Sequence, residues 1–268
     1  MRARKALGQH FLRDPALLAR IAAASGAQAG DVVLEIGPGL GGLTGALLRT
    51  GATVVAIERD PRMAGILLRA HANESFVLVE GDALELDWAS LVAPWVAQGA
   101  TWRVVGNIPY YITSPLLDKA LSAPLPASVT YLVQEEVARR LVAEPGGEDY
   151  GALTIGIRAV ADCAIAMRVG RGAFSPPPKV DSAVVHLVPR QVPLVPSDQI
   201  PDLRRLVVSL FSYRRKRMHR ALREARALDA EAATAALEAA NIDPDVRPEV
   251  LEPEAFVRLL ERLEAASS

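Results

Sequence analysis

The side chains best suited to chemistry lie in the short run Asn107-Ile108-Pro109-Tyr110. An exocyclic amine on a nucleobase is a poor nucleophile because its lone pair is delocalised into the ring. The amide oxygen of Asn107 and a backbone carbonyl, which we assign to Ile108, can accept its two N–H bonds and favour a tetrahedral, more nucleophilic nitrogen. Pro109 fixes the backbone so that this carbonyl points inward, and Tyr110 offers a ring on which a base stacks, a contact worth roughly 1 to 3 kcal/mol. The other interpretation is an ordinary loop in which Asn107 caps a helix.

A glycine-rich run that begins at Glu35 indicates a ligand-binding turn between a strand and a helix. Gly37, Gly39 and Gly42 let the backbone turn tightly and approach a ligand closely. Glu58 follows Gly37 by twenty-one residues. A carboxylate at the end of the second strand can accept hydrogen bonds from both hydroxyls of a ribose. The two features together predict a nucleoside cofactor at the carboxyl ends of the strands.

A third strand end bears on the identity of that cofactor. The glycine spacing also satisfies the dinucleotide fingerprint, so an NAD-dependent oxidoreductase fits these residues as well. The run Gly81-Asp82-Ala83 adds an acidic residue that can meet an adenine amino group. Acidic side chains on three strand ends, Glu35, Glu58 and Asp82, suit S-adenosylmethionine, whose sulfonium and ammonium groups are cationic and which has no pyrophosphate.

Alternating strand-like and amphipathic stretches predict an α/β fold with a parallel sheet and crossover helices. The predicted strands are 32–36, 53–58, 76–80, 102–106 and 129–134, and the predicted helices are 43–50, 61–71, 89–98, 114–122 and 135–143. A further helix, 153–161, precedes two strands, 164–169 and 183–188, which we expect as an antiparallel pair at one edge of the sheet.

Four prolines without periodicity mark 189–201 as a domain boundary. Beyond it, helical spacing predicts helices over 203–211, 217–225, 230–240 and 253–265, with Asp229 as an N-cap. The sequence therefore predicts a Rossmann-like α/β domain over residues 1–190, a linker over 191–201 and a small all-helical domain over 202–268.

Composition excludes several other classes of protein. The 268 residues are 50% hydrophobic and carry a net charge of −1, which excludes wholesale disorder. No apolar stretch reaches the roughly 18 to 20 residues of a membrane span, and the first 13 residues lack the apolar core of a secretory signal. Cys163 is the single cysteine, and the four histidines lack ligand spacing. We therefore expect no disulfide, no metal site and a cytoplasmic location.

Charge is distributed unevenly along the chain. Residues 204–226 hold nine basic residues against Glu224 alone, a net of +8, whereas residues 31–100 sum to −5 and residues 227–268 to −7. One strongly basic segment of helix length in a near-neutral chain predicts a local contact with a polyanion. A solvated helix face balanced by the acidic tail explains this composition equally well.

Together these motifs make the chain resemble the ribosomal RNA adenine N6,N6-dimethyltransferases over nearly its whole length. An amino-terminal run, 5–12, the glycine loop, Glu58-Arg59, the Asp82 run and the Asn107 run follow one another in the order of that family. Two more runs, 174–183 and 211–216, are not shared with methyltransferases at large. The resemblance implies a class I methyltransferase domain with a mostly parallel sheet, a small carboxy-terminal helical domain, and S-adenosylmethionine as cofactor.

The resemblance also implies roles for individual residues. Phe174 is expected to face Tyr110 across a flipped adenine, and Lys179 is expected to contact RNA phosphates together with the basic cluster. The family more often has Asn where this chain has His10. The implied catalytic residues are Asn107, Ile108, Pro109, Tyr110 and Phe174. The implied cofactor site comprises Gln9, His10, Leu12, Glu35, Gly37, Gly39, Glu58, Asp82, Ala83 and Asn107, and the implied RNA contacts are Lys179, Arg214, Arg215, Lys216 and Arg217.

The resemblance implies a substrate as well. In that family, two adjacent adenosines in the 3′-terminal hairpin of small-subunit (16S) ribosomal RNA each receive two methyl groups, and we expect the chain to act as a monomer on the 30S subunit or its precursor. The motif at Phe174 and the full helical tail resemble this branch more than the resistance-type relatives that modify 23S RNA. A ribosome-assembly factor with dispensable catalysis and an NAD-dependent oxidoreductase remain as alternatives from other classes.

Overall fold

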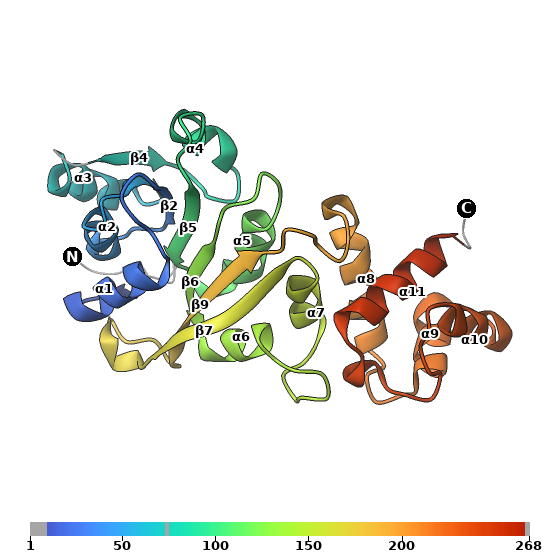
Figure 1. The fold of residues 1–268 in the computed structure, drawn as a ribbon. Coiled ribbons are helices and arrows are strands. Elements are labelled where there is room, and N and C mark those ends of the chain that lie inside the picture. Colours follow the sequence, from blue (N-terminus) through green and yellow to red (C-terminus); the bar gives the residue numbers. More distant parts are fainter. Residues whose placement is uncertain (1–9, 73–74, 266–268) are drawn as a thin grey trace. The chain divides into compact units, whose positions relative to one another are not determined.

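The computed structural model describes residues 10–72 and 75–265 and divides the chain into two compact units (Figure 1). The first unit comprises Met1–Ala138 and Ala164–Pro189, and the second comprises Arg139–Cys163 and Arg190–Ser268. The predicted ranges, 1–190 and 202–268, assign residues 139–163 to the first domain, whereas their contacts group them with the second unit. The predicted cofactor residue Gln9 lies outside the described residues.

A seven-stranded sheet with the strand order β4-β3-β2-β5-β6-β9-β7 contains every strand that the sequence predicts. The strands are β2 (Val32–Ile36), β3 (Thr53–Glu58), β4 (Phe76–Glu80), β5 (Trp102–Asn107), β6 (Val129–Gln134), β7 (Ala161–Val169) and β9 (Ser182–Pro189). Strands β2 to β6 pair in parallel, and β9 pairs with β6 in the antiparallel direction. The sheet is therefore mostly parallel, and its antiparallel part lies at the β7 edge, as predicted.

The central strands are almost continuously apolar because helices cover both faces of a parallel sheet. All residues of β2 are buried, and so are five of the six residues of β3. The register places Ile36 beside Ile57 of β3 and beside Gly106 of β5. The three strands therefore end at one level, which brings the residues that follow them to a common edge.

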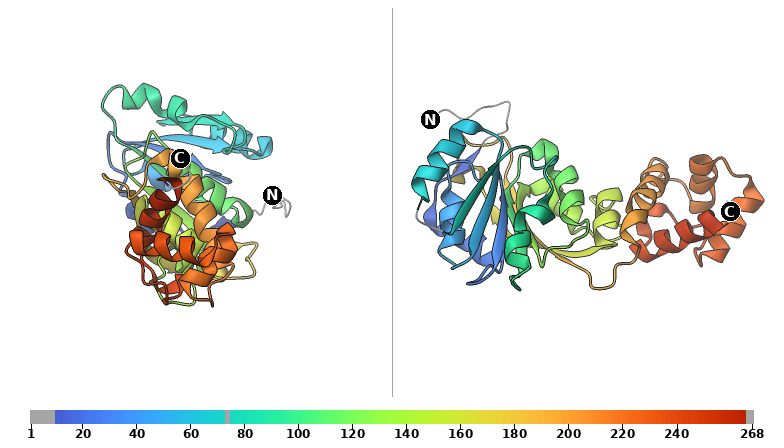
Figure 2. Two further views of the ribbon diagram at one scale, coloured as in Figure 1. Left: turned by 90° about the vertical axis from the view of Figure 1, so that its right-hand side faces the viewer. Right: turned by 90° about the horizontal axis from the view of Figure 1, so that it is seen from above.

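Helices α1 (Pro15–Ala24), α2 (Gly42–Leu48) and α3 (Pro61–Ala70) cover one face of the sheet, and α4 (Trp88–Val96) and α5 (Thr113–Ala120) cover the other (Figure 2). A further helix, α6 (Glu135–Leu141), follows β6 directly. Asp14 and Asp60 cap α1 and α3 by accepting a backbone N–H bond, and each precedes a proline in the first helical turn. Helix α1 has no counterpart among the predicted helices.

A second, two-stranded sheet pairs β1 (Phe11–Leu12) with β8 (Phe174–Ser175) and was not predicted. The pairing is antiparallel and sets Leu12 opposite Phe174. Gly39 approaches this sheet so closely that an added Cβ would lie 2.9 Å from the ring of Phe11, and its φ of +58° also favours glycine. The amino-terminal strand is thereby packed onto the glycine loop.

The second unit is helical and consists of α7 (Ala152–Arg158), α8 (Ile200–Phe211), α9 (Met218–Arg226), α10 (Ala230–Ala239) and α11 (Pro253–Ala265). Helix α7 packs against α8 and α11. Helix α8 begins at Ile200, three residues before the predicted start, because Pro201 is compatible with the first turn of a helix. The prediction that Asp229 caps α10 is confirmed, since its Oδ1 accepts the N–H of Ala232 at 2.8 Å.

Candidate functional site

A pocket in the first unit lies at the carboxyl ends of the parallel strands. Every predicted cofactor residue that the structure describes lines it: His10, Leu12, Glu35, Gly37, Gly39, Glu58, Asp82, Ala83 and Asn107. Apolar side chains that the sequence analysis did not single out complete the wall, among them Leu18, Leu43 and Ile57. All three belong to apolar helical or strand patterns in the sequence. Such patterns indicate that a residue is buried but do not show whether it lines a pocket or packs in the core.

Glu35 is a buried acid in the pocket wall. It is 1% exposed, and its Oε2 accepts a hydrogen bond from the Thr44 hydroxyl at 2.7 Å. Burial, with a smaller contribution from the charge of nearby Glu58, raises the pKa of Glu35 to about 8 against the opposing hydrogen bond. No Lys, Arg or His among the described residues forms an ion pair with it. The pocket therefore holds a carboxyl group whose charge is not compensated.

Glu58, at the end of β3, has both carboxyl oxygens in use. Oε2 accepts the N–H of Gly39 at 3.0 Å, and Oε1 accepts the N–H of Asp60 at 2.8 Å. Burial raises its pKa, and these two bonds oppose the rise. The bond to Gly39 fixes the glycine loop against β3 and defines the position of the Glu58 carboxyl group.

Asp82 follows the third predicted strand and lies nearer to solvent than the two glutamates. Its side chain is 22% exposed and pairs with Arg59 at 3.1 Å. Its Oδ1 also accepts the N–H of Leu84 at 3.0 Å. The Asp82 carboxylate is thus held by a turn at the pocket wall, where an oxygen can meet a ligand amino group.

Asn107 is the last residue of β5, and its side chain is oriented by the amino-terminal strand. The Asn107 Nδ2 donates to the backbone carbonyl of His10 at 2.8 Å. This bond occupies the amide nitrogen and leaves Oδ1 as the acceptor. The imidazole of His10 bonds through Nδ1 to the carbonyl of Pro176 at 2.8 Å. His10 therefore links the Asn107 run to the proline-rich run 174–183.

Tyr110 begins a short 3-10 turn, Tyr110–Ile112, and is half-buried. Its hydroxyl is 3.0 Å from the Ser182 Oγ at the start of β9. Its ring stacks with that of His10, with centroids 6.1 Å apart and planes 21° apart. Tyr111, which the sequence analysis did not single out, is 59% exposed and lines the pocket.

Like Ile108 and Tyr110, Phe174 is not among the residues that line the pocket. It is 5% exposed and packs in the hydrophobic core with residues that include Leu18 and Val184. In this structure its environment is that of a core residue beside a proline-rich turn, and its expected place opposite Tyr110 stays a prediction.

The predicted RNA-binding residues fall into two environments. In the second unit, Arg214 pairs with Glu249, Lys216 with Glu224 and Arg217 with Asp245, at distances between 2.8 and 2.9 Å. Arg215 is exposed and forms no ion pair with any described residue. A second pocket is lined by Arg215, Lys216, Arg217, His219, Arg220, Asp245 and Arg247. Lys179 is exposed in the first unit.

The described residues contain neither a candidate membrane span nor a candidate metal site. No helix within 10–72 and 75–265 combines the length and apolar character needed to cross a membrane. Over the same residues, no group of three or more His, Cys, Asp or Glu side chains is placed to hold a metal ion.

The strand order and the pocket at the strand ends define a Rossmann-like class I methyltransferase fold. The family described as ribosomal RNA adenine dimethylase matches residues 1–265. Ribosomal RNA small subunit methyltransferase A of Pseudomonas putida is 42% identical over 264 residues, which cover 98% of this chain and 95% of the relative. A dimethyladenosine transferase from Plasmodium falciparum has a similar structure, with a TM-score of 0.82 and 27% identity over 96% of this chain and 98% of that one. The 23S rRNA methyltransferase ErmE gives a TM-score of 0.70 and 31% identity over 95% of this chain and 99% of that one.

The chain belongs to the ribosomal RNA adenine dimethylase family. The resemblance inferred from the motifs, the fold class and the assignment as a methyltransferase enzyme are thereby confirmed.

Proposed function

We propose that the chain transfers methyl groups from S-adenosylmethionine to N6 of two adjacent adenosines in the 3′-terminal hairpin of small-subunit ribosomal RNA, within the 30S subunit or its precursor. The observation that carries this proposal is the orientation of Asn107. Because its Nδ2 is bonded to the His10 carbonyl, its Oδ1 is available at the pocket wall to accept a hydrogen bond from an amine.

The pocket residues fit the proposed cofactor. When bound, S-adenosylmethionine supplies an electrophilic methyl group on a cationic sulfur. Glu35 offers a buried carboxyl that pairs with no cation within 10–72 and 75–265, which suits a ligand that carries positive charge. Glu58 offers carboxylate oxygens for ribose hydroxyls, and Asp82 offers an oxygen for the adenine amino group. A dinucleotide would require a site for its pyrophosphate, and the buried acids disfavour such an anion.

The substrate amine is activated by hydrogen bonding and not by a base. The Asn107 Oδ1 and the Ile108 carbonyl accept the two N–H bonds of the target N6, which shifts its lone pair out of conjugation. That lone pair forms the new bond to the methyl carbon while the bond between carbon and sulfur breaks and sulfur keeps its electrons. The nitrogen is then cationic, and its proton passes to water. Tyr110 supplies the ring on which the base stacks.

The basic residues of the second unit supply the RNA contact. Arg215 is exposed. It lines a pocket together with His219 and with four other basic residues, Lys216, Arg217, Arg220 and Arg247. Such clusters bind phosphates without reading sequence. Single-stranded or loop adenosines are the sensible targets because they are the easiest to unstack.

Transfer of labelled methyl groups tests the proposal. Unmethylated small subunits, large subunits and free ribosomal RNA are incubated with the protein and labelled S-adenosylmethionine, and the product nucleoside is identified by mass spectrometry. We expect dimethyladenosine in the small subunit alone. Label confined to large-subunit RNA would assign the chain to the function named for ErmE, and absence of transfer would favour an oxidoreductase or an assembly factor. Full rescue of ribosome maturation by Asn107→Ala would favour the assembly factor.

A further inference from the structure

The ring of Tyr110 is held at its polar end by a side chain from β9, which lies two strands away from β5 in the sheet. The Tyr110 hydroxyl and the Ser182 Oγ are 3.0 Å apart, although the two residues are 72 positions apart in the chain. Ser182 is 0% exposed, and the bond to the half-buried Tyr110 is partly shielded from solvent. Among the described residues, the Ser182 hydroxyl has Tyr110 as its only hydrogen-bond partner.

We propose that Ser182 is a positioning residue for methyl transfer: its hydroxyl fixes the far end of the Tyr110 ring on which the target base stacks, and so the direction of the long axis of that ring. The inference rests on the proposed function and adds to it a residue that does not touch the substrate. A tyrosine side chain has two rotatable bonds, and contacts along the ring alone leave its tilt free to vary. A hydrogen bond at the hydroxyl, far from Cα, restricts that tilt.

The position of Ser182 itself does not depend on its side chain. Its backbone pairs with Gln134 in the ladder between β6 and β9. The preceding residue, Asp181, accepts the N–H of Glu135 through its backbone carbonyl at 3.0 Å and the N–H of Arg171 through its carboxylate at 2.8 Å. Removal of the Ser182 hydroxyl is therefore expected to leave the start of β9 in place and to release Tyr110 alone.

The state of the Tyr110 hydroxyl is consistent with this role. Burial raises the pKa of Tyr110, and the hydrogen bond with Ser182 opposes that rise. The phenol is neutral throughout the physiological range, so the bond is present whenever the enzyme works. It fixes geometry and does not take part in proton transfer.

The test is a double-mutant cycle with Ser182→Ala, Tyr110→Phe and the double variant, each assayed on unmethylated small subunits with labelled S-adenosylmethionine. Each single variant removes one partner of the same bond. We expect kcat to fall by about three- to tenfold in each, as a net hydrogen bond predicts. The double variant should fall no further, and the Kd for S-adenosylmethionine should not change in any of them.

Ser128→Ala is the matched control. Ser128 is a buried serine just before β6, at the other end of that strand from Ser182 and away from the residues that line the pocket. Its hydroxyl donates to the carbonyl of Ser25 and accepts from Arg103. If loss of a buried hydroxyl lowered kcat through general loosening, this variant would lower it as well. Additive effects in the cycle, or an equal loss in Ser128→Ala, would overturn the proposal.

A second measurement tests the contact between Ser182 and Tyr110 without any substrate. In protein labelled with 13C at the tyrosine Cζ, the Tyr110 resonance is assigned by its disappearance in Tyr110→Phe. We expect this resonance to shift in Ser182→Ala and to stay in place in Ser128→Ala. An unchanged resonance in Ser182→Ala overturns the positioning role. If the parent protein transfers no methyl group to any RNA, the proposed function fails, and this spectrum still decides whether Ser182 holds Tyr110.

Discussion

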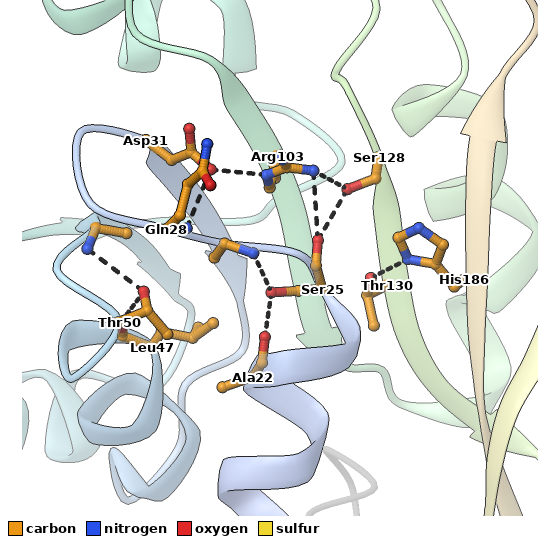
Figure 3. Close-up of polar contacts among 12 residues, drawn as sticks. Ala22, Ser25, Gln28, Asp31, Leu47, Thr50, Arg103, Ser128, Thr130 and His186 are labelled. Atoms are coloured by element: carbon orange, nitrogen blue, oxygen red, sulfur yellow. Dashed lines mark hydrogen bonds and ion pairs between the residues drawn. The ribbon is translucent and has the colours of Figure 1, made fainter.

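A buried acidic residue lies at each end of strand β2, and the two residues differ in how their charge is compensated. Asp31, just before the strand, is 4% exposed and pairs with Arg103 at 2.9 Å (Figure 3). The same guanidinium donates to the Ser128 hydroxyl at 3.1 Å, and the Asp31 carboxylate also accepts the N–H of Gln28 at 3.2 Å. The charge at this end is thus compensated by a cation and by a network of hydrogen bonds.

Glu35, four residues further along, is at least as deeply buried, and no cation among the described residues pairs with it. Its neighbours are the hydroxyl of Thr44 and a second acid, Glu58. Burial of an unpaired carboxyl group opposes folding unless the group is protonated. The ion pair therefore stabilises the amino end of β2, whereas its carboxyl end keeps an unfavourable charge environment that a cationic ligand would relieve.

Asn107→Ala removes the proposed catalytic amide at the carboxyl end of the sheet and gives the largest expected effect. The variant removes the acceptor for the substrate amine, and loss of one preorganised group of this kind lowers kcat by about 100- to 1,000-fold. Because Asn107 makes its side-chain bond to His10 and carries no core packing, we expect the free energy of unfolding to change by less than about 1 kcal/mol. Methyl transfer to unmethylated small subunits and urea unfolding measure the two quantities. Retained transfer would remove Asn107 from the mechanism.

Arg103→Ala removes the cation at the amino end of β2 and should produce the opposite pattern, a loss of stability with little effect on cofactor binding. It leaves the Asp31 carboxylate buried without its cation, which destabilises a protein by about 3 to 5 kcal/mol. The Kd for S-adenosylmethionine should stay within about twofold of the parent value, since Arg103 is not among the residues that line the pocket.

The control is Arg139→Ala, which removes the partner of Asp149. That pair is similar in length, at 3.1 Å, but the arginine is half-exposed, so we expect less than about 1 kcal/mol. Equal destabilisation by the two variants in urea unfolding would show that burial does not distinguish these ion pairs.

The central sheet could be predicted from the sequence because its strands are continuously apolar and alternate with amphipathic helices. Helix α1 was missed although Asp14-Pro15 is a typical helix start. Strands β1 and β8 had no local signal, since each has two residues and their pairing joins Leu12 to Phe174. Strand pairing over such a distance follows from the fold and not from either segment.

The polar residues of the pocket could be predicted because each stands at a strand end or in a recognisable motif. The contacts that orient them could not. Thr44 reaches Glu35 through the turn of α2, and Ser182 reaches Tyr110 across the sheet, so both depend on register and side-chain rotamers. The pair of Asp31 and Arg103 likewise depends on the alignment of β2 with β5.

Glu35→Gln tests the charge environment at the functional end. The pKa of Glu35 is about 8 in the folded protein and has an ordinary value of 4.5, so the folded state binds the proton more tightly. The resulting stabilisation is complete below about pH 4.5 and is lost as pH rises through about 8. Glutamine cannot ionise, so the variant should lose this part of the pH dependence and at pH 8 should exceed the parent in stability by about 1 to 3 kcal/mol. Urea unfolding at pH 5, 6.5 and 8 provides the comparison.

The same variant also tests whether Glu35 takes part in cofactor binding. If Glu35 compensates a cationic ligand, Glu35→Gln should weaken binding of S-adenosylmethionine by about tenfold at pH 8, where about half of the parent carboxyl is ionised. Below pH 6 the parent and the variant should bind with similar affinity. Equal affinities at every pH, measured by calorimetry, would show that this acid serves the fold alone.

Arg215→Ala extends the contrast between paired and unpaired charges to the second unit and gives the smallest expected effect. Arg214 is engaged by Glu249 at 2.9 Å, whereas Arg215 is exposed and has no ion pair among the described residues. A free arginine that meets a phosphate releases about one counterion, so Arg215→Ala should make the slope of log K against log salt shallower by about one. Between 50 and 200 mM salt, the affinity of the variant should therefore fall by about three- to fourfold less than that of the parent. Arg214→Ala is the matched control and should leave the slope closer to that of the parent, because its charge is already compensated by Glu249. Filter binding to unmethylated small subunits across this salt range measures both slopes, and an unchanged slope in Arg215→Ala would count against the basic cluster as a phosphate site.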